Sequence, residues 1–203
     1  MFFARTFFCA LFVMTVCAVS PVAAKQLTID PGKPCGGMPV KDSNPEELLP
    51  VLGEGAGWTL EWKATCMDMG GSMMGVKIPR SRVLAARYVK GQDAVAVTLT
   101  INEDPEQRSG TILDIPAEAA QYSMVKALKS EKITYAGKEA YTGVLGGMGE
   151  YRQDVLDVML SKHTLLSIQR EYSAASKPMD MVGWADDVLS VESYSDPTWL
   201  KGK

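Results

Sequence analysis

A strict alternation of apolar and polar residues from Trp58 to Cys66 constrains the fold of this chain more than any other stretch of its sequence. A period of two places one set of side chains on the buried face of a β-strand and the other set in water, whereas a helix needs a period near 3.6. We therefore predict a half-buried strand, with Cys66 on the side that faces the core. The apolar positions are Trp58, Leu60, Trp62, Ala64 and Cys66.

Several further apolar runs separated by turn residues predict a mostly antiparallel sheet around this strand. Gly91 marks one expected turn and residues 161–163 mark another, and 133–142 is expected to be a strand pair or one strand bent at Gly137. Runs of strands that follow one another directly favour hairpins over parallel crossovers. The expected strands lie at 83–89, 93–101, 133–142, 153–160 and 164–172.

Two segments with apolar residues at helical spacing predict the main helices, one over 116–130 and one over 177–191. Ser176 is the expected N-cap of the second helix. A short helix is also expected to begin at Asn44. The predicted fold class is α/β (α+β): a mostly antiparallel sheet flanked by two main helices in a single domain, with its core at about 58–191.

Residues 1–24 have the three parts of a secretory signal peptide. Arg5 precedes an apolar run over 7–19, which ends in small residues around Ala24. That run is shorter than the roughly 20 residues that a membrane-spanning helix needs. We therefore expect cleavage after Ala24, a mature domain over 25–203, a periplasmic or secreted location, and no stable membrane anchor after cleavage.

Export changes the interpretation of the four cysteines. Cys9 and Cys17 would leave with the signal peptide, so that Cys35 and Cys66 remain. In an oxidising compartment a single remaining pair most simply forms a disulfide, here stabilising by about 3.5 kcal/mol in the chain-entropy model. A redox-active pair is disfavoured because the sequence has no CxxC motif. A metal site that uses both cysteines has no nearby histidine.

The stretch 67–75 is rich in methionine and glycine, and we expect it to be a loop. Thioether sulfurs are soft ligands that suit Cu(I). If the preceding strand continued, Met67 and Met69 would lie on one face with Cα atoms about 6.6 Å apart, and Met73 or Met74 could complete a copper site. The alternatives are that these methionines fill irregular gaps in the core or form an adaptable binding surface.

Charge and motifs weigh against several functions. The net charge of −3 becomes −4 when Arg5 is lost, and without a block of like charge no nucleic-acid partner is expected. His163 is the only histidine and is expected in an exposed turn. No GxSxG, HExxH, P-loop or EF-hand pattern occurs. The acidic residues with no evident partner, which we expect to be exposed, are Asp154, Asp157, Asp186 and Asp187.

In the order of its elements the chain resembles the Mog1/PsbP-like domains. The stretch 133–141, the hairpin over 153–172 and the closing helix with 185–189 carry this resemblance. It implies an antiparallel sheet flanked by helices and a non-catalytic role, by analogy of layout. The cysteine pair and the methionine-rich stretch depart from the usual pattern.

The leading interpretation is an exported, non-enzymatic binding or accessory protein with a protein or small-molecule partner. The absence of a catalytic constellation supports this interpretation, together with the resemblance in layout. A periplasmic Cu(I)-binding protein that uses Met67, Met69, Met73 and Met74 is the alternative. An enzyme with an unfamiliar site is a third.

Overall fold

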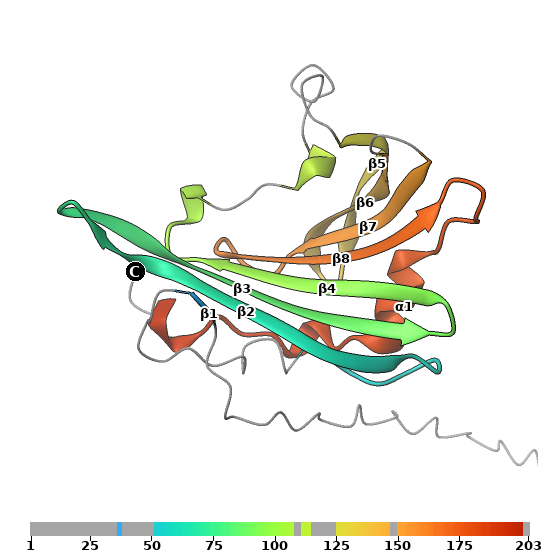
Figure 1. The fold of residues 1–203 in the computed structure, drawn as a ribbon, viewed down its shortest axis with the longest axis horizontal. Coiled ribbons are helices and arrows are strands. Elements are labelled where there is room, and N and C mark those ends of the chain that lie inside the picture. The colour runs from blue at the N-terminus through green and yellow to red at the C-terminus, as the bar shows by residue number, and fades with distance from the viewer. Residues whose placement is uncertain (1–35, 38–50, 108–110, 115–124, 147–149, 201–203) are drawn as a thin grey trace, which may run out of the picture.

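The structure is a computed structural model that describes residues 36–37, 51–107, 111–114, 125–146 and 150–200. In that part of the chain eight strands form one sheet in the order β1-β2-β3-β4-β8-β7-β6-β5 (Figure 1). Only β1 and β2 run parallel; the other neighbours are antiparallel. The strands are β1 (Gly36–Gly37), β2 (Thr59–Met73), β3 (Val76–Lys90), β4 (Asp93–Asn102), β5 (Lys126–Tyr135), β6 (Lys138–Gly146), β7 (Tyr151–Met159) and β8 (Thr164–Ser173).

The prediction of a mostly antiparallel sheet is confirmed. Glycine supplies the positive φ that tight hairpin turns need, with φ of 62° at Gly91 between β3 and β4 and 72° at Gly137 between β5 and β6. The expected turn at 161–163 joins β7 to β8. The signal peptide at 1–24 and the short helix expected from Asn44 lie outside the described residues.

The prediction of two main helices is wrong, because the described residues are mostly β. Residues 115–124 of the first predicted helix lie outside the described part, and its end belongs to β5. There, pairing with β6 overrides the helical spacing. Strand β5 is the last in the sheet, and charged side chains with a bulge between Ala127 and Lys129 are typical of such an edge.

The second predicted helix exists but is shorter. It is α1 (Met181–Val188), and its N-cap is Asp180 instead of Ser176. The Asp180 carboxylate accepts hydrogen bonds from the backbone N–H groups of Val182 and Gly183, both at 3.1 Å. The 3-10 helices η5 (Val191–Ser193) and η6 (Thr198–Leu200) follow it.

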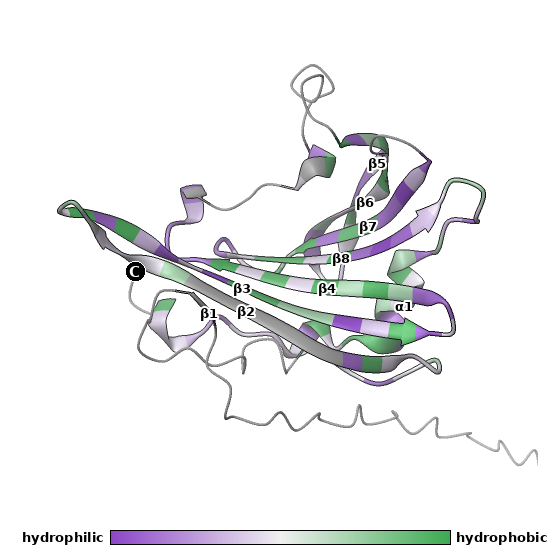
Figure 2. Ribbon diagram, in the orientation of Figure 1, coloured by the Kyte–Doolittle hydropathy of each residue, from purple (hydrophilic) through white to green (hydrophobic). Residues whose placement is uncertain are grey.

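The main core lies between α1 and one face of the sheet, which we call the inner face. Trp184 of α1 packs edge-on against Trp58, with ring centroids 5.7 Å apart, and against Tyr88, at 5.4 Å. The hydropathy of β3 and β4 varies from residue to residue in keeping with this burial (Figure 2). The inner-face residues of these strands are Leu84, Ala86, Tyr88, Val95, Val97, Leu99 and Ile101.

A smaller core lies on the opposite side of the sheet, which we call the outer face. Leu113 of the 3-10 helix η3 (Ile112–Asp114) packs there with Tyr141, Leu145 and Val155. The middle of β7 is therefore covered on both faces, and residues 154–158 are all buried. The outer faces of β3 and β4 keep more exposed positions, such as Arg87 and Ala96.

Tyr88 links the inner face to the segment that precedes β2. Its hydroxyl donates to the Gly53 carbonyl oxygen at 3.0 Å and accepts from the Gly53 N–H at 3.2 Å. Burial raises the pKa of this phenol to about 12. Because the folded pKa exceeds the unfolded value near 10, the contribution of Tyr88 is fully present below pH 10 and is lost as the pH rises toward 12.

Replacing Tyr88 with phenylalanine is expected to lower the free energy of unfolding by about 1–2 kcal/mol at pH 7, because two buried backbone groups lose a partner. Above pH 10 the wild-type protein should lose stability faster than the variant. Urea unfolding of both proteins between pH 7 and pH 11 measures the difference. Parallel pH profiles would show that Tyr88 does not titrate as its burial requires.

Candidate functional site

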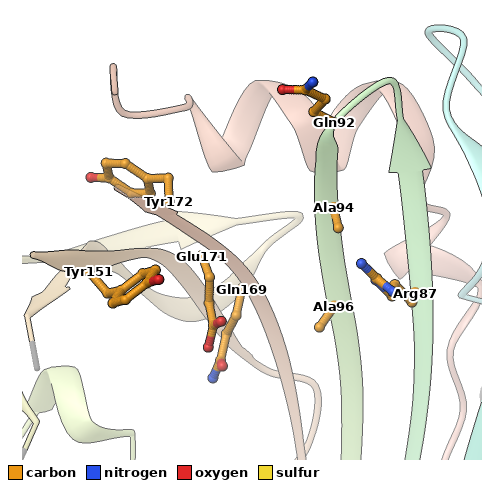
Figure 3. A pocket seen from close by; sticks show the side chains of 8 residues that line it. All are labelled: Arg87, Gln92, Ala94, Ala96, Tyr151, Gln169, Glu171 and Tyr172. Atoms are coloured by element: carbon orange, nitrogen blue, oxygen red, sulfur yellow. The ribbon is translucent and has the colours of Figure 1, made fainter. Parts of the chain in front are cut away.

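A hollow of about 460 Å³ opens on the outer face of the sheet where β3, β4, β8 and β7 lie side by side (Figure 3). We call it the outer-face hollow. Its volume lies within the range typical of small-ligand sites. Its lining residues are Arg87, Gln92, Ala94, Ala96, Tyr151, Gln169, Glu171 and Tyr172.

Two small side chains on β4 account for the hollow. Ala94 and Ala96 present only methyl groups, while larger side chains stand on the strands to either side (Figure 3). Arg87 lies on the β3 side, and Gln169 and Glu171 lie on the β8 side. Because β8 is the neighbour of β4, residues far apart in the sequence line one concavity.

The polar groups of the hollow are held by neighbours on the same face. The Arg87 guanidinium lies 3.1 Å from a Glu61 carboxylate oxygen. The Glu171 carboxylate accepts a hydrogen bond of 2.8 Å from the Gln153 amide nitrogen. The Gln169 amide nitrogen donates to the Ser167 hydroxyl oxygen at 3.0 Å. The hollow thus offers oriented donors and acceptors to a polar ligand.

Tyr151 adds an aromatic ring to this polar rim. It stands at the start of β7 and is 70% exposed, which makes it one of the large hydrophobic side chains exposed among the described residues. A tyrosine ring offers an apolar face and a hydroxyl group that can hydrogen-bond. The hollow can therefore receive a ligand that has both polar groups and apolar surface.

Two predictions of exposed aspartates are wrong. Asp157 is only 5% exposed on the outer side of β7, where its carboxylate accepts from the Thr111 hydroxyl and, at 2.5 Å, from the Ser167 hydroxyl. Burial raises the pKa of Asp157, and these two hydrogen bonds oppose the increase. Asp154 is 2% exposed on the other side of the same strand. Carboxylates are usually solvated, which is why both were expected to be exposed, but β7 is covered on both faces.

His163 is also buried, at 4% exposed, contrary to the expectation of an exposed turn residue. Its ring nitrogen Nδ1 lies 2.9 Å from the Asn102 carbonyl oxygen, and the Asn102 N–H donates to the His163 carbonyl oxygen at 2.9 Å. The hairpin turn is thus fastened to the end of β4. Asp186 and Asp187 are exposed, as predicted.

The methionine-rich stretch is a strand and not the expected loop. Strand β2 runs through it to Met73, and the hairpin turns at Met74 and Gly75, where φ is 51° and 80°. Gly70 and Gly71 also have positive φ beside a bulge, so the glycines serve the distorted backbone of a hairpin. The tip of this hairpin extends beyond β4 (Figure 1).

The methionines lie at two places along this hairpin. Met67 and Met69 are two residues apart on β2, whereas Met73 is four residues beyond Met69, about 13 Å farther along an extended strand. Met69 is 43% exposed and Met74 is 96% exposed. The side chains of Met67 and Met73 lie outside the described part. In the part that is described, no three His, Cys, Asp or Glu side chains gather as a metal site would require.

The residues that follow the two cysteines of the expected disulfide in the sequence belong to a described strand pair. In the parallel pairing of β1 with β2, Gly36 lies opposite Met67 and Gly37 opposite Asp68. Cys35 and the side chain of Cys66 lie outside the described residues, and among the residues that are described no disulfide is found. Cys66 itself belongs to β2 and pairs in register with Leu84, which is an inner-face residue.

Comparison of the chain with protein-family models, with curated proteins and with solved structures found no match. Among the helices in the described ranges, none has the length and apolar character needed to span a membrane. The candidate site is thus defined by the geometry and chemistry of its own residues.

Proposed function

We propose that this chain is an exported, non-enzymatic binding or accessory protein whose ligand occupies the outer-face hollow. The main support for the proposal is the hollow itself, in which Arg87, Gln169 and Glu171 surround Ala94 and Ala96. Its lining residues include no histidine, cysteine or serine, and the buried Asp154, Asp157 and His163 are engaged in contacts within the fold. The hollow is suited to holding a ligand by hydrogen bonds.

Filling the hollow tests this proposal. Ala96→Phe places a ring on an exposed strand position, and Leu128→Phe adds a ring at an exposed position on β5 as a control. Mature wild-type protein and both variants are purified from the compartment of the natural protein, and bound small molecules and proteins are identified by mass spectrometry. A ligand recovered unchanged with wild type and Leu128→Phe but lost with Ala96→Phe is expected. Equal recovery from all three would reject the hollow as the site.

The proposed location is periplasmic or secreted, after cleavage of a signal peptide at 1–24. Support comes from the arrangement of Arg5, the apolar run over 7–19 and the small residues before Lys25. Nucleic acid is not among the proposed partners, since the net charge is negative. The accessory role also agrees with the resemblance to Mog1/PsbP-like domains in layout.

We further propose the Cys35–Cys66 disulfide. Support comes from the register of β1 and β2, because the residues that precede Gly36 and Met67 in the sequence are Cys35 and Cys66. Neighbouring strands lie about 4.8 Å apart, within the Cα separation that a disulfide bridges.

Mass spectrometry of the exported protein is expected to give a mass lower by two hydrogen atoms than that of the reduced chain. Reduction should lower the free energy of unfolding by about 3.5 kcal/mol. The variant Cys35→Ser combined with Cys66→Ser should behave like the reduced protein, with no further change when a reductant is added. Two free thiols in the exported protein would contradict the disulfide.

Copper binding is the second candidate function. The observation in its favour is that β2 continues through Met67 and Met69, which the two-sulfur arrangement requires. Titration of the mature protein with Cu(I) under reducing conditions tests it. Binding that is lost in Met67→Leu and Met69→Leu but kept in Met73→Leu and Met74→Leu would support this pair. Absence of binding, or binding unchanged in all four variants, would reject Cu(I) binding at these methionines.

A further inference from the structure

We infer that the ligand class of the outer-face hollow is a neutral oligosaccharide. This inference rests on the proposed function, and it names what the hollow takes. Three features of the hollow support it: an exposed aromatic ring, a set of planar polar side chains, and a balance of charge. Each of these features matches a property of a sugar chain.

The aromatic ring is that of Tyr151, which is 70% exposed at the edge of the hollow. Leaving an aromatic ring in water forfeits the free energy of burying it, so an exposed ring beside a concavity is a natural anchor for a ligand. Sugar rings present faces of C–H groups, which pack against an aromatic ring while their hydroxyl groups remain at the periphery. Tyr151 is therefore suited to stack against one sugar unit.

The planar polar groups are the guanidinium of Arg87, the amides of Gln92 and Gln169, and the carboxylate of Glu171. Guanidinium and carboxylate groups offer two donors or two acceptors side by side, and an amide offers both kinds. Neighbouring hydroxyl groups on a sugar ring each donate and accept, so they can pair with such groups two at a time. Figure 3 shows that Arg87 faces the hollow from one side and Glu171 from the other.

The charge of the hollow favours an uncharged ligand. The lining residues hold one cation, Arg87, and one anion, Glu171. Arg87 is already paired with Glu61 at 3.1 Å, so its guanidinium is not a free cation for an anionic ligand. A strongly anionic ligand would bring a charge that the hollow does not complement, and a strongly cationic ligand would have to compete with Arg87 for the carboxylates. The hollow is not an enclosed cavity, so a ligand longer than the hollow is not excluded by its shape.

The test uses defined oligosaccharides with the folded mature protein. Neutral probes are the tetrasaccharides of cellulose, starch and chitin, and heparin tetrasaccharide is the charged comparison. Binding is followed by calorimetry and by the backbone amide signals of a ¹⁵N-labelled sample. At least one neutral probe should bind, with shifts at residues 87, 94, 96, 169 and 171, and heparin tetrasaccharide should bind more weakly.

Variants of Tyr151 separate stacking from a structural effect. Tyr151→Ala should weaken binding of the neutral probe about tenfold, and Tyr151→Phe should retain it, because the ring is kept. Leu128→Ala, which removes another exposed apolar side chain, is the control and should bind as wild type does. Equal binding by Tyr151→Ala and wild type would overturn the stacking role.

The outcome distinguishes this inference from the proposed function. If no neutral probe binds, but ligands recovered with the natural protein are lost in Ala96→Phe, the oligosaccharide class is wrong and the hollow remains a binding site. If no neutral probe binds and Ala96→Phe recovers the same ligands as wild type, the oligosaccharide class and the binding role of the hollow are both wrong. Tighter binding of heparin tetrasaccharide than of every neutral probe would also overturn the inference, since it would show a cationic site.

Discussion

Replacing Trp184 with alanine is expected to lower the free energy of unfolding by about 3–5 kcal/mol, the range for removing a large aromatic side chain from a core. Trp184 is 5% exposed and is the residue of α1 that packs edge-on against both Trp58 and Tyr88. Edge-to-face aromatic pairs stabilise by about 0.5–1.5 kcal/mol beyond the burial of their area. The substitution removes two such pairs and leaves a cavity between α1 and the sheet.

Urea unfolding, followed by far-ultraviolet circular dichroism, measures this effect. A typical domain is stable by only about 5–15 kcal/mol, so Trp184→Phe is the second variant in case Trp184→Ala does not fold. The phenylalanine variant keeps a ring and should lose clearly less. The control is Trp199→Ala, since Trp199 is only partly buried beside the core. If Trp184→Ala lowers the free energy of unfolding no more than Trp199→Ala does, Trp184 is not a major contributor to the stability of the main core.

Replacing Asp154 with alanine is expected to cost about 3 kcal/mol or more, because it removes one partner of a buried charge pair. The Asp154 side chain is 3% exposed, and its carboxylate lies 3.4 Å from the Arg170 guanidinium. It also accepts a hydrogen bond of 2.6 Å from the Met179 N–H, just before α1 begins. Arg170 donates to the Lys177 carbonyl oxygen at 3.1 Å. The ion pair therefore joins β7 and β8 to the segment that precedes α1.

Two matched variants test this network. Asp154→Asn keeps an acceptor for the Met179 N–H but loses the charge, so its cost should be lower than that of Asp154→Ala. Asp93 also pairs with Arg170, at 2.7 Å, but its side chain is 48% exposed, so Asp93→Ala should cost no more than about 1 kcal/mol. Urea unfolding of the three variants ranks their losses in the free energy of unfolding. A larger loss for Asp93→Ala than for Asp154→Ala would contradict the burial argument.

Local patterns predict part of this fold well. The hairpin of β3 and β4 combines apolar alternation with a glycine that provides the positive φ of its turn, and both signals lie within one short stretch. The hairpin of β7 and β8 follows from two apolar runs with the short polar stretch 161–163 between them. Neighbours in the chain form these pairs, so the sequence of each segment contains most of the information that determines it.

Other elements depend on contacts that one segment does not reveal. Strand β2 continues through Gly70 and Gly71, which are poor strand formers, because β3 pairs with Met69 and Gly71 on either side of Gly70. Residues 126–130 have helical spacing, but pairing with β6 makes them a strand. Asp154 and Asp157 are buried because α1 and η3 cover opposite faces of β7, and neither cover is visible from the strand itself.

The outer-face hollow was missed for the same kind of reason. Its residues come from β3 and β4 on one side and from β7 and β8 on the other, and they meet only because β8 pairs with β4. One local signal was present, namely two alanines at alternate positions of β4, where longer side chains would fill the surface. That signal marks a hollow only after the order of the strands is known.

The most direct test of the binding role assigned to the outer-face hollow is a map of ligand contact on the mature protein. The ¹⁵N-labelled protein is titrated with the ligand that is recovered with the natural protein, and the backbone amide signals are followed. The largest shifts are expected at residues 87, 94, 96, 169 and 171, around the hollow. Largest shifts at residues 69–76, in the methionine-rich hairpin, with the hollow unchanged, would contradict it.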